Sequence, residues 1–159
     1  MPFTLSARSR ARLVGVHPEL VRVVELAIRL STVDFVVTQG NRTQAEQDAL
    51  YAQGRTKPGP VVTWTRNSNH IGGRAVDVAP FVDGAVEWDD NGKLGLWPRI
   101  AEAFKSAADE LSVPIVWGGN WTKPDRPHFE LIRGWERPKA EPKPDFSNVV
   151  GGSDTVPGT

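Results

Sequence analysis

The sequence predicts an α+β domain in which helices pack beside a small, mostly antiparallel sheet. Apolar residues recur with helical spacing in two segments, and short runs rich in β-branched residues lie between turns rich in Gly and Pro. The chain has 159 residues, of which 39% are hydrophobic, enough for one compact core. We expect one domain at residues 1–135 and a flexible tail rich in Pro and Gly at residues 136–159.

The first half of the domain contains two predicted helices around a strand. Pro18 begins a helix whose apolar stripe is Leu20, Val23, Val24, Ala27 and Ile28. Residues 34–39 are rich in β-branched residues and stop at Gly40, which indicates a strand. The pair Thr43 and Glu46 fits a capping box, so a second helix is expected up to Gly54.

The second half alternates loops with shorter elements. Residues 55–69 and 83–95 are rich in turn-forming residues and are expected to be loops. Residues 74–79 indicate a strand interrupted by Pro80. A third helix is expected from Pro98, with the apolar stripe Ile100, Ala103, Phe104, Ala107, Ala108 and Leu111. Residues 114–117 and 128–132 are predicted to be two further strands.

Composition excludes several classes of function. The formal net charge is zero, so we expect neither a nucleic-acid partner nor stable membrane association. There is no run of 18 apolar residues, and the first 20 residues lack the apolar core of a signal peptide. Without cysteine, any bound metal must be held by histidine and carboxylate side chains.

The segment from Ser68 to Asp77 has the residues of a metal site. His70 precedes a glycine turn, and Asp77 lies in the strand that follows. Glycine lets the backbone fold back tightly, so a ligand before the turn and one after it can converge. Ala75 shares a strand face with Asp77 and leaves room for a metal and a substrate. Imidazole and carboxylate ligands with one position left for water are typical of catalytic zinc.

A second segment supplies a further imidazole, His128, and an acid three residues before it, Asp125. Asp125 lies in a turn stiffened by Pro124 and Pro127, from which a carboxylate can reach the attacking water without binding the metal. Such a carboxylate can take a proton from the water and pass it to the leaving amine. An ordinary turn-forming aspartate is the alternative interpretation.

The two segments together resemble the LAS-type zinc peptidases, which include D-alanyl-D-alanine carboxypeptidases, dipeptidases and phage L-alanyl-D-glutamate endopeptidases. The matching residues are Ser68, His70, Gly73, Ala75, Asp77, Asp125 and His128. Segments 16–20, 39–43 and 117–121 resemble the phage endolysin branch in particular, so the resemblance covers roughly residues 5–132. It implies one Zn²⁺ ion bound by His70, Asp77 and His128, with Asp125 as general acid and base.

The resemblance also implies a role for Arg42, which would stabilise the carbonyl oxyanion or fix a substrate carboxylate. Gln39, Ser68 and Trp121 are candidate substrate-binding residues. Packing at the strand end is the alternative for Gln39 and core packing is the alternative for Trp121, while Ser68 is also expected to shape the ligand turn. Glu130 shares a strand face with His128 and either orients that ligand or is a surface carboxylate. Some phage relatives are calcium-regulated, and residues 89–92 (Asp-Asp-Asn-Gly) resemble part of a Ca²⁺ loop, but a solvated turn is favoured because the EF-hand spacing is absent.

The function expected from this resemblance is that of a monomeric endolysin that hydrolyses the L-alanyl-D-glutamate bond of peptidoglycan peptides. Without a signal peptide, it would accumulate in the host cytoplasm and reach the cell wall once the membrane is permeabilised. A D-Ala-D-Ala carboxypeptidase or dipeptidase is the first alternative. A non-catalytic wall-binding module is the second, although such a module has no use for an acid beside the metal.

Overall fold

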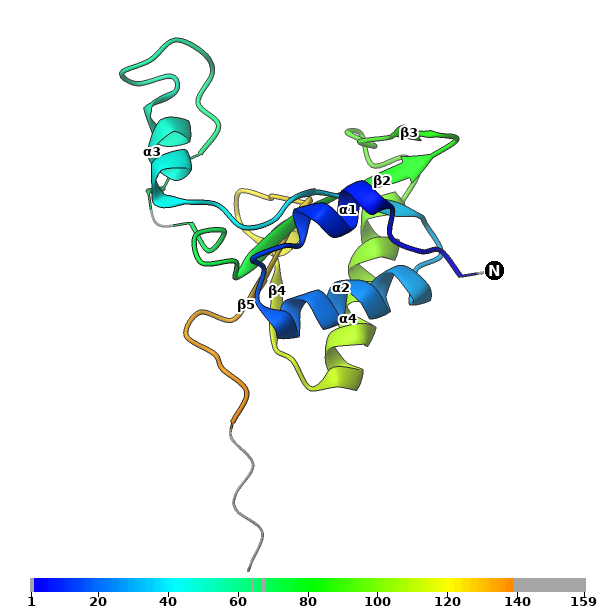
Figure 1. Ribbon diagram of the computed structural model, residues 1–159. Helices are drawn as coiled ribbons and strands as arrows, with labels where there is room; N and C mark the ends of the chain where they lie inside the picture. The colour runs from blue at the N-terminus through cyan, green and yellow to red at the C-terminus, as the bar shows by residue number, and fades with distance from the viewer. Residues whose placement is uncertain (1, 64, 67, 139–159) are drawn as a thin grey trace, which may run out of the picture.

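The computed structural model describes residues 2–63, 65–66 and 68–138. Its helices are α1 (Ala7–Arg12), α2 (Pro18–Leu30), α3 (Gln44–Ala52) and α4 (Leu96–Leu111), with a short 3₁₀ turn, η1 (Gly118–Asn120). Its strands are β1 (Phe35–Gln39), β2 (Ala75–Val82), β3 (Ala85–Val86), β4 (Ile115–Trp117) and β5 (His128–Leu131). Figure 1 shows α2 and α4 packed together below the sheet, while α3 and the following loop project away from this body.

The sheet is antiparallel and has the order β1-β2-β5-β4, with β3 paired to the end of β2. This arrangement confirms the predicted α+β class. The register makes Asp77 the direct cross-strand neighbour of both Gln39 in β1 and His128 in β5. Because direct neighbours share a face, these three polar side chains form one row across the centre of the sheet.

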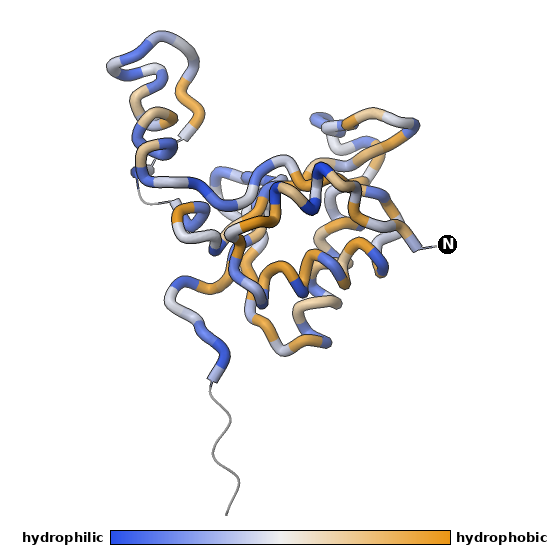
Figure 2. The backbone as a smooth tube through the Cα atoms, in the orientation of Figure 1, coloured by the Kyte–Doolittle hydropathy of each residue, from blue (hydrophilic) through white to orange (hydrophobic). Residues whose placement is uncertain are grey.

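The opposite face of the sheet carries the core. Val76 and Val78 of β2 and Phe129 of β5 alternate with the polar row and are fully buried. The Phe129 ring stacks on Phe104 of α4, with ring centroids 3.9 Å apart. Apolar residues concentrate in this body of sheet, α2 and α4 (Figure 2). One face of the sheet is therefore fixed by core packing, which leaves the other face for a polar site.

Several elements differ from the prediction. Helix α1 was not expected; it is held to β1 because the buried Ser9 hydroxyl accepts a hydrogen bond from the Val37 N–H at 2.9 Å. Strand β2 continues through Pro80, since Phe81 N–H still donates to Asp34 and the Pro80 carbonyl still accepts from Glu87. The predicted loop at residues 83–95 contains the short strand β3.

The body of the domain continues beyond residue 135. Glu136 forms ion pairs with His17 and Arg74, at 2.8 and 2.7 Å. Arg137 pairs with Glu19 at the start of α2. These two residues, predicted to belong to the tail, are thus joined to the domain, whereas residues 139–159 of the predicted tail lie outside the described residues. None of the helices in the described ranges is long and apolar enough to cross a membrane.

Candidate metal site and cleft

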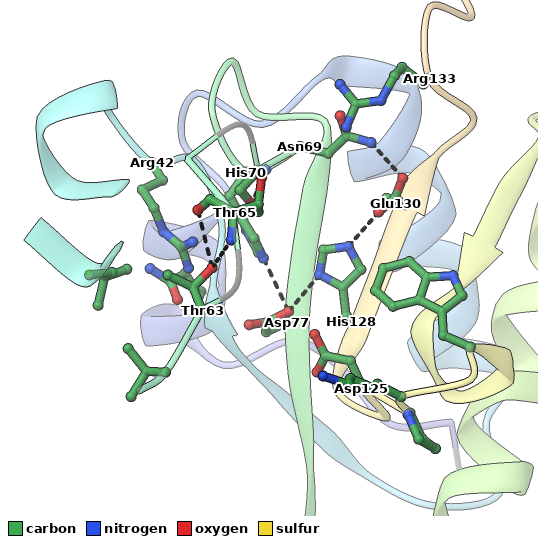
Figure 3. Close-up of a pocket in the computed structure, with 17 residues that line it drawn as sticks. Arg42, Thr63, Thr65, Asn69, His70, Asp77, Asp125, His128, Glu130 and Arg133 are labelled. Carbon is green, nitrogen blue, oxygen red and sulfur yellow. Dashed lines mark hydrogen bonds and ion pairs between the residues drawn. The ribbon is translucent and has the colours of Figure 1, made fainter. Parts of the chain in front are cut away.

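Three of the predicted site residues meet on the open face of the sheet. His70 Nε2 and His128 Nδ1 each lie 3.2 Å from the same oxygen, Oδ1 of Asp77. One possible ligand atom from each of these three residues lies within 4.8 Å of the corresponding atoms of the other two. A tetrahedral zinc site with bonds of 2.0–2.1 Å has edges of about 3.3 Å. The spacing therefore suits a single metal ion, and Figure 3 shows the three side chains converging.

The partners of the two imidazoles determine which nitrogen faces the group. The other ring nitrogen of His70, Nδ1, lies 2.9 Å from the Gly40 carbonyl, which only accepts, so Nδ1 carries the hydrogen. The other nitrogen of His128, Nε2, lies 2.7 Å from Oε1 of Glu130 and donates to it. Both lone-pair nitrogens then face an Asp77 oxygen. Electron-pair donors this close need a proton or a cation between them, which fits a metal site.

The glycine turn places His70. Gly72 and Gly73 have φ angles of +80° and +73°, which L side chains rarely adopt. A Cβ on Gly73 would also lie 2.1 Å from the Gly15 carbonyl oxygen, so no larger residue fits there. The Ser68 hydroxyl accepts a hydrogen bond from His70 N–H at 3.1 Å, as expected of a residue that shapes this turn.

Glu130 connects His128 to a third residue. Its Oε1 faces His128 Nε2, and its Oε2 accepts a hydrogen bond from the amide of Asn69 at 2.5 Å. Asn69 is buried and directly precedes His70 in the chain. The two histidines are therefore linked through Asn69 and Glu130 as well as through Asp77. This contact resolves the two interpretations of Glu130 in favour of one that orients a histidine, whereas Asn69 was not singled out from the sequence.

Asp125 lies at the edge of the same cleft. Its backbone N–H donates to the Gly118 carbonyl at 2.8 Å, and its own carbonyl accepts from His128 N–H at 3.1 Å. A Cβ on Gly118 would lie 2.4 Å from the Asp125 carbonyl oxygen, so glycine is required for this close approach. Partial burial and the charge of Asp77 raise the pKa of Asp125. A raised pKa suits a carboxylate that must exchange a proton near neutral pH.

Charge is tightly coupled within the group. Burial opposes the ionised form of Asp77, but its close contacts with His128 and His70 outweigh burial and hold the pKa of Asp77 well below its usual value. Burial likewise opposes the charged form of His128, yet its hydrogen bonds to Asp77 and Glu130 raise its pKa to about 9. Without a metal, the proton on His128 thus occupies the place that a cation would take.

Arg42 lies on the other side of the group from Asp125, as Figure 3 shows. Only 7% of Arg42 is exposed, and its backbone N–H donates to the His70 carbonyl at 2.8 Å. Burial lowers the pKa of Arg42, while the charges of Asp77, Glu46 and Asp125 favour its ionised form. Because the normal pKa of arginine is far above neutral, the side chain remains a cation.

The cleft around these groups contains the other predicted residues. Its lining includes Gln39, Ser68 and Trp121, together with Arg42, Asp125 and the three members of the cluster. Trp121 is 40% exposed, and the centroid of its ring lies 5.1 Å from that of the His128 ring. Lys123 and Arg133, which were not predicted, also line the cleft. Cationic side chains therefore stand beside the carboxylates of the site.

The segment that resembles part of a calcium loop has a structural use. Asp89 is buried, and its two carboxylate oxygens accept hydrogen bonds from the backbone N–H groups of Leu94 and Leu96, at 3.0 and 3.1 Å. Leu96 is the first residue of α4. Asp89 thus orders the turn that starts this helix, which favours the turn interpretation over a cation-binding one.

The antiparallel sheet and the convergent His, Asp and His side chains, beside an acid and an arginine, agree with the resemblance to the LAS-type peptidases. The family described as phage L-alanyl-D-glutamate peptidase matches residues 1–137. The chain belongs to this family, which confirms the expected family and enzyme class.

Individual proteins named as L-alanyl-D-glutamate peptidases or endopeptidases are also similar to this chain. The chain is 33% identical over 134 residues to the L-alanyl-D-glutamate peptidase of Escherichia phage T5, covering 84% of this chain and 93% of the relative. It is 41% identical over 110 residues to the peptidoglycan L-alanyl-D-glutamate endopeptidase CwlK of Bacillus subtilis (strain 168), covering 63% and 62% of the two chains. The crystal structure of the Serratia marcescens L-Ala D-Glu endopeptidase ChiX superimposes with a TM-score of 0.68 at 40% identity, covering 79% of this chain and 87% of that one.

Proposed function

We propose that this protein is a zinc-dependent endopeptidase that hydrolyses the L-alanyl-D-glutamate bond in peptidoglycan stem peptides. The observation that carries the proposal is the convergence of His70, Asp77 and His128 at a cleft that also holds an acid and a buried arginine. The relatives from phage T5, Bacillus subtilis and Serratia marcescens, which are all named for cleavage of the L-alanyl-D-glutamate bond, support the same substrate.

His70 Nε2, Asp77 Oδ1 and His128 Nδ1 would hold the zinc ion. When bound, zinc acts as a Lewis acid that lowers the pKa of water to about 7 and polarises the scissile carbonyl. Asp125, at the cleft edge, takes the proton of the attacking water and delivers it to the nitrogen of the leaving D-glutamate. The carbonyl of Gly40 and the carboxylate of Glu130 keep the histidines in the required tautomers.

Arg42 supplies positive charge where the carbonyl oxygen becomes negative. Its burial supports this role, since a cation held away from bulk water stabilises developing charge more strongly. Gln39 continues the row of Asp77 and His128 across the sheet, so its amide can bind the peptide backbone next to the scissile bond. Ser68 and Trp121 complete the substrate contacts, with the indole providing an apolar wall.

A digest of purified peptidoglycan analysed by mass spectrometry tests the proposed bond. The expected products are peptides with a new amino terminus on D-glutamate and glycan strands that retain L-alanine. Release of free D-alanine would instead identify a D-Ala-D-Ala carboxypeptidase or dipeptidase. A wild-type protein that binds walls in zinc-containing buffer but cleaves nothing would identify a non-catalytic binding module.

The metal and the acid can be separated by substitution. We expect His70→Ala to lose zinc and activity together, because only two of the three proposed ligands, Asp77 and His128, then remain. The matched comparison is Asp125→Ala, which should keep zinc and lose turnover. Equal activity of Asp125→Ala and wild type would contradict the role of this carboxylate.

The proposed setting is lysis of a host cell by a monomeric enzyme that reaches the wall from the cytoplasm after the membrane is permeabilised. The phage T5 relative, which the chain matches over 93% of its length, supports this setting. Light scattering of the purified protein tests the oligomeric state. The route is tested by producing the protein inside bacterial cells, which should lyse only after their membrane is permeabilised.

A further inference from the structure

Helix α3 carries a buried polar residue that the mechanism above does not use. Gln47 is completely buried, and it is the buried residue of a helix whose other side chains are exposed or half-buried. A buried amide that lacked partners would cost free energy, so its hydrogen bonds show what it holds. This helix belongs to the lobe that projects from the body in Figure 1.

The Gln47 amide joins the arginine of the site to one wall of the cleft. Its carbonyl Oε1 accepts a hydrogen bond from Nη1 of Arg42 at 2.5 Å. Its Nε2 donates to the Thr65 carbonyl at 2.6 Å and to the Thr63 hydroxyl at 3.2 Å. Thr63 and Thr65 line the cleft and lie beside Arg42 in Figure 3. The Gln47 side chain therefore fixes the position of the Arg42 guanidinium relative to this wall of the cleft.

The chemistry of the partner matters as well as its position. Arg42 forms no ion pair with any residue in the described ranges, and its Nε is buried without a hydrogen-bond partner there. A neutral amide can orient the guanidinium without cancelling its charge, whereas a carboxylate at the same position would neutralise it. The cation is thus held in a fixed direction while its charge is kept for the substrate.

We propose that Gln47 is a positioning residue that fixes the guanidinium of Arg42 toward the scissile carbonyl and couples it to the wall formed by Thr63 and Thr65. This inference rests on the proposed function of Arg42. It predicts a loss of turnover when the amide is removed, even though Gln47 itself does not contact the substrate. A misplacement of about 1 Å at a catalytic group costs up to about 100-fold in rate.

The main variant is Gln47→Met, which keeps the length of the side chain and removes its hydrogen bonds. We expect kcat on an L-alanyl-D-glutamate substrate to fall roughly 10- to 100-fold, with little change in KM or zinc content. The matched control is Gln53→Met, because Gln53 joins the same helix to the same loop through the Pro60 carbonyl but does not contact Arg42. This control should keep the wild-type kcat.

A double-mutant cycle with Arg42→Ala separates positioning from general support of the fold. If Gln47 acts through the arginine, Gln47→Met should change kcat by less than about twofold once Arg42 is absent. An equal loss with and without Arg42, or a wild-type kcat for Gln47→Met, would overturn the inference. If Gln47→Met does not fold, Gln47→Glu retains an acceptor for Arg42 but neutralises it, and full kcat in that variant would overturn it too.

A measurement on the metal-free protein gives a readout other than activity. In wild type, the side-chain N–H signals of Arg42 in NMR spectra should show restricted rotation, which Gln47→Met should release and Gln53→Met should not. Unchanged Arg42 signals in Gln47→Met would contradict the inference. Wild type that fails to cleave the L-alanyl-D-glutamate bond would refute the proposed function instead, whereas active wild type, impaired Arg42→Ala and unimpaired Gln47→Met would refute the positioning role alone.

Discussion

Replacing Glu130 by glutamine keeps the shape of the side chain but removes the negative charge that faces His128. In the structure, the Glu130 carboxylate accepts hydrogen bonds from His128 Nε2 at 2.7 Å and from the Asn69 amide at 2.5 Å. A glutamine can accept only one of these bonds, because its NH₂ group would meet the second donor. The substitution therefore weakens the support of one proposed zinc ligand and leaves the ligand itself in place.

The size of the effect follows from these two contacts. A hydrogen bond to a charged group contributes about 1.5–3 kcal/mol, against about 0.5–1.5 kcal/mol for a neutral one. Because Glu130 is only half-buried, the difference between the charged and the neutral hydrogen bond should lie at the lower end of this range. The NH₂ group of the new glutamine, facing a second donor, adds to the loss. We expect zinc binding to weaken by about 1.5–2 kcal/mol, or roughly 10- to 30-fold, within the range seen for groups that orient metal-bound histidines.

Competition with a fluorescent zinc chelator measures this change directly. The matched control is Glu136→Gln, since Glu136 forms the same kind of contact with His17, at 2.8 Å, away from the proposed ligands. Zinc affinity should fall in Glu130→Gln and stay unchanged in Glu136→Gln. Equal affinities for Glu130→Gln and wild type would refute the inference that this carboxylate supports His128.

Three further predictions concern the acid, the loop that holds it and the titration of the site. Asp125→Asn should retain zinc and lose about 10²- to 10⁴-fold in kcat; a smaller loss would contradict its role in proton transfer. Gly118→Ala places a Cβ 2.4 Å from the Asp125 carbonyl, so kcat should fall roughly 10- to 100-fold with zinc retained, and normal turnover would show that the loop tolerates displacement. In the metal-free protein, burial disfavours charged His128, but hydrogen bonds to Asp77 and Glu130 raise its pKa to about 9. Because this pKa lies above that of the unfolded chain, the stabilising contribution is complete below about pH 6.5 and is lost as the pH rises through about 9. Calorimetry at pH 7.5 in buffers of different ionisation enthalpy should detect about one proton released by His128 per zinc bound, in addition to the release from zinc-bound water. A total release of less than one proton would contradict this titration.

Much of the fold could be predicted because local patterns and burial agree. The apolar stripes that begin at Pro18 and Pro98 correspond to α2 and α4, the helices that cover the sheet. Helix α1 could not be predicted, since its six residues are rich in arginine. Its side-chain links to β1, from the buried Ser9 hydroxyl and the Arg12 guanidinium to the backbone of Val37, form only in the folded chain. The continuation of β2 through Pro80 depends on partners in β1 and β3, which are distant in sequence.

The candidate site likewise contains some residues that could be predicted from the sequence and others that could not. His70, Asp77, Asp125 and His128 could be singled out because their chemistry and spacing are visible in short segments. Gln47 could not, because a glutamine on a polar helix is normally exposed and only the folded chain brings it to Arg42. The contact between Asn69 and Glu130 spans 61 positions and depends on the pairing of β2 with β5.

The most direct test of the proposed zinc site is an anomalous difference map recorded at the zinc edge from crystals of the active protein. We predict one peak, bonded to His70 Nε2, Asp77 Oδ1 and His128 Nδ1 at about 2.0–2.2 Å. A peak bonded to other residues, or an active protein whose crystals show no metal between these three side chains, would contradict the account.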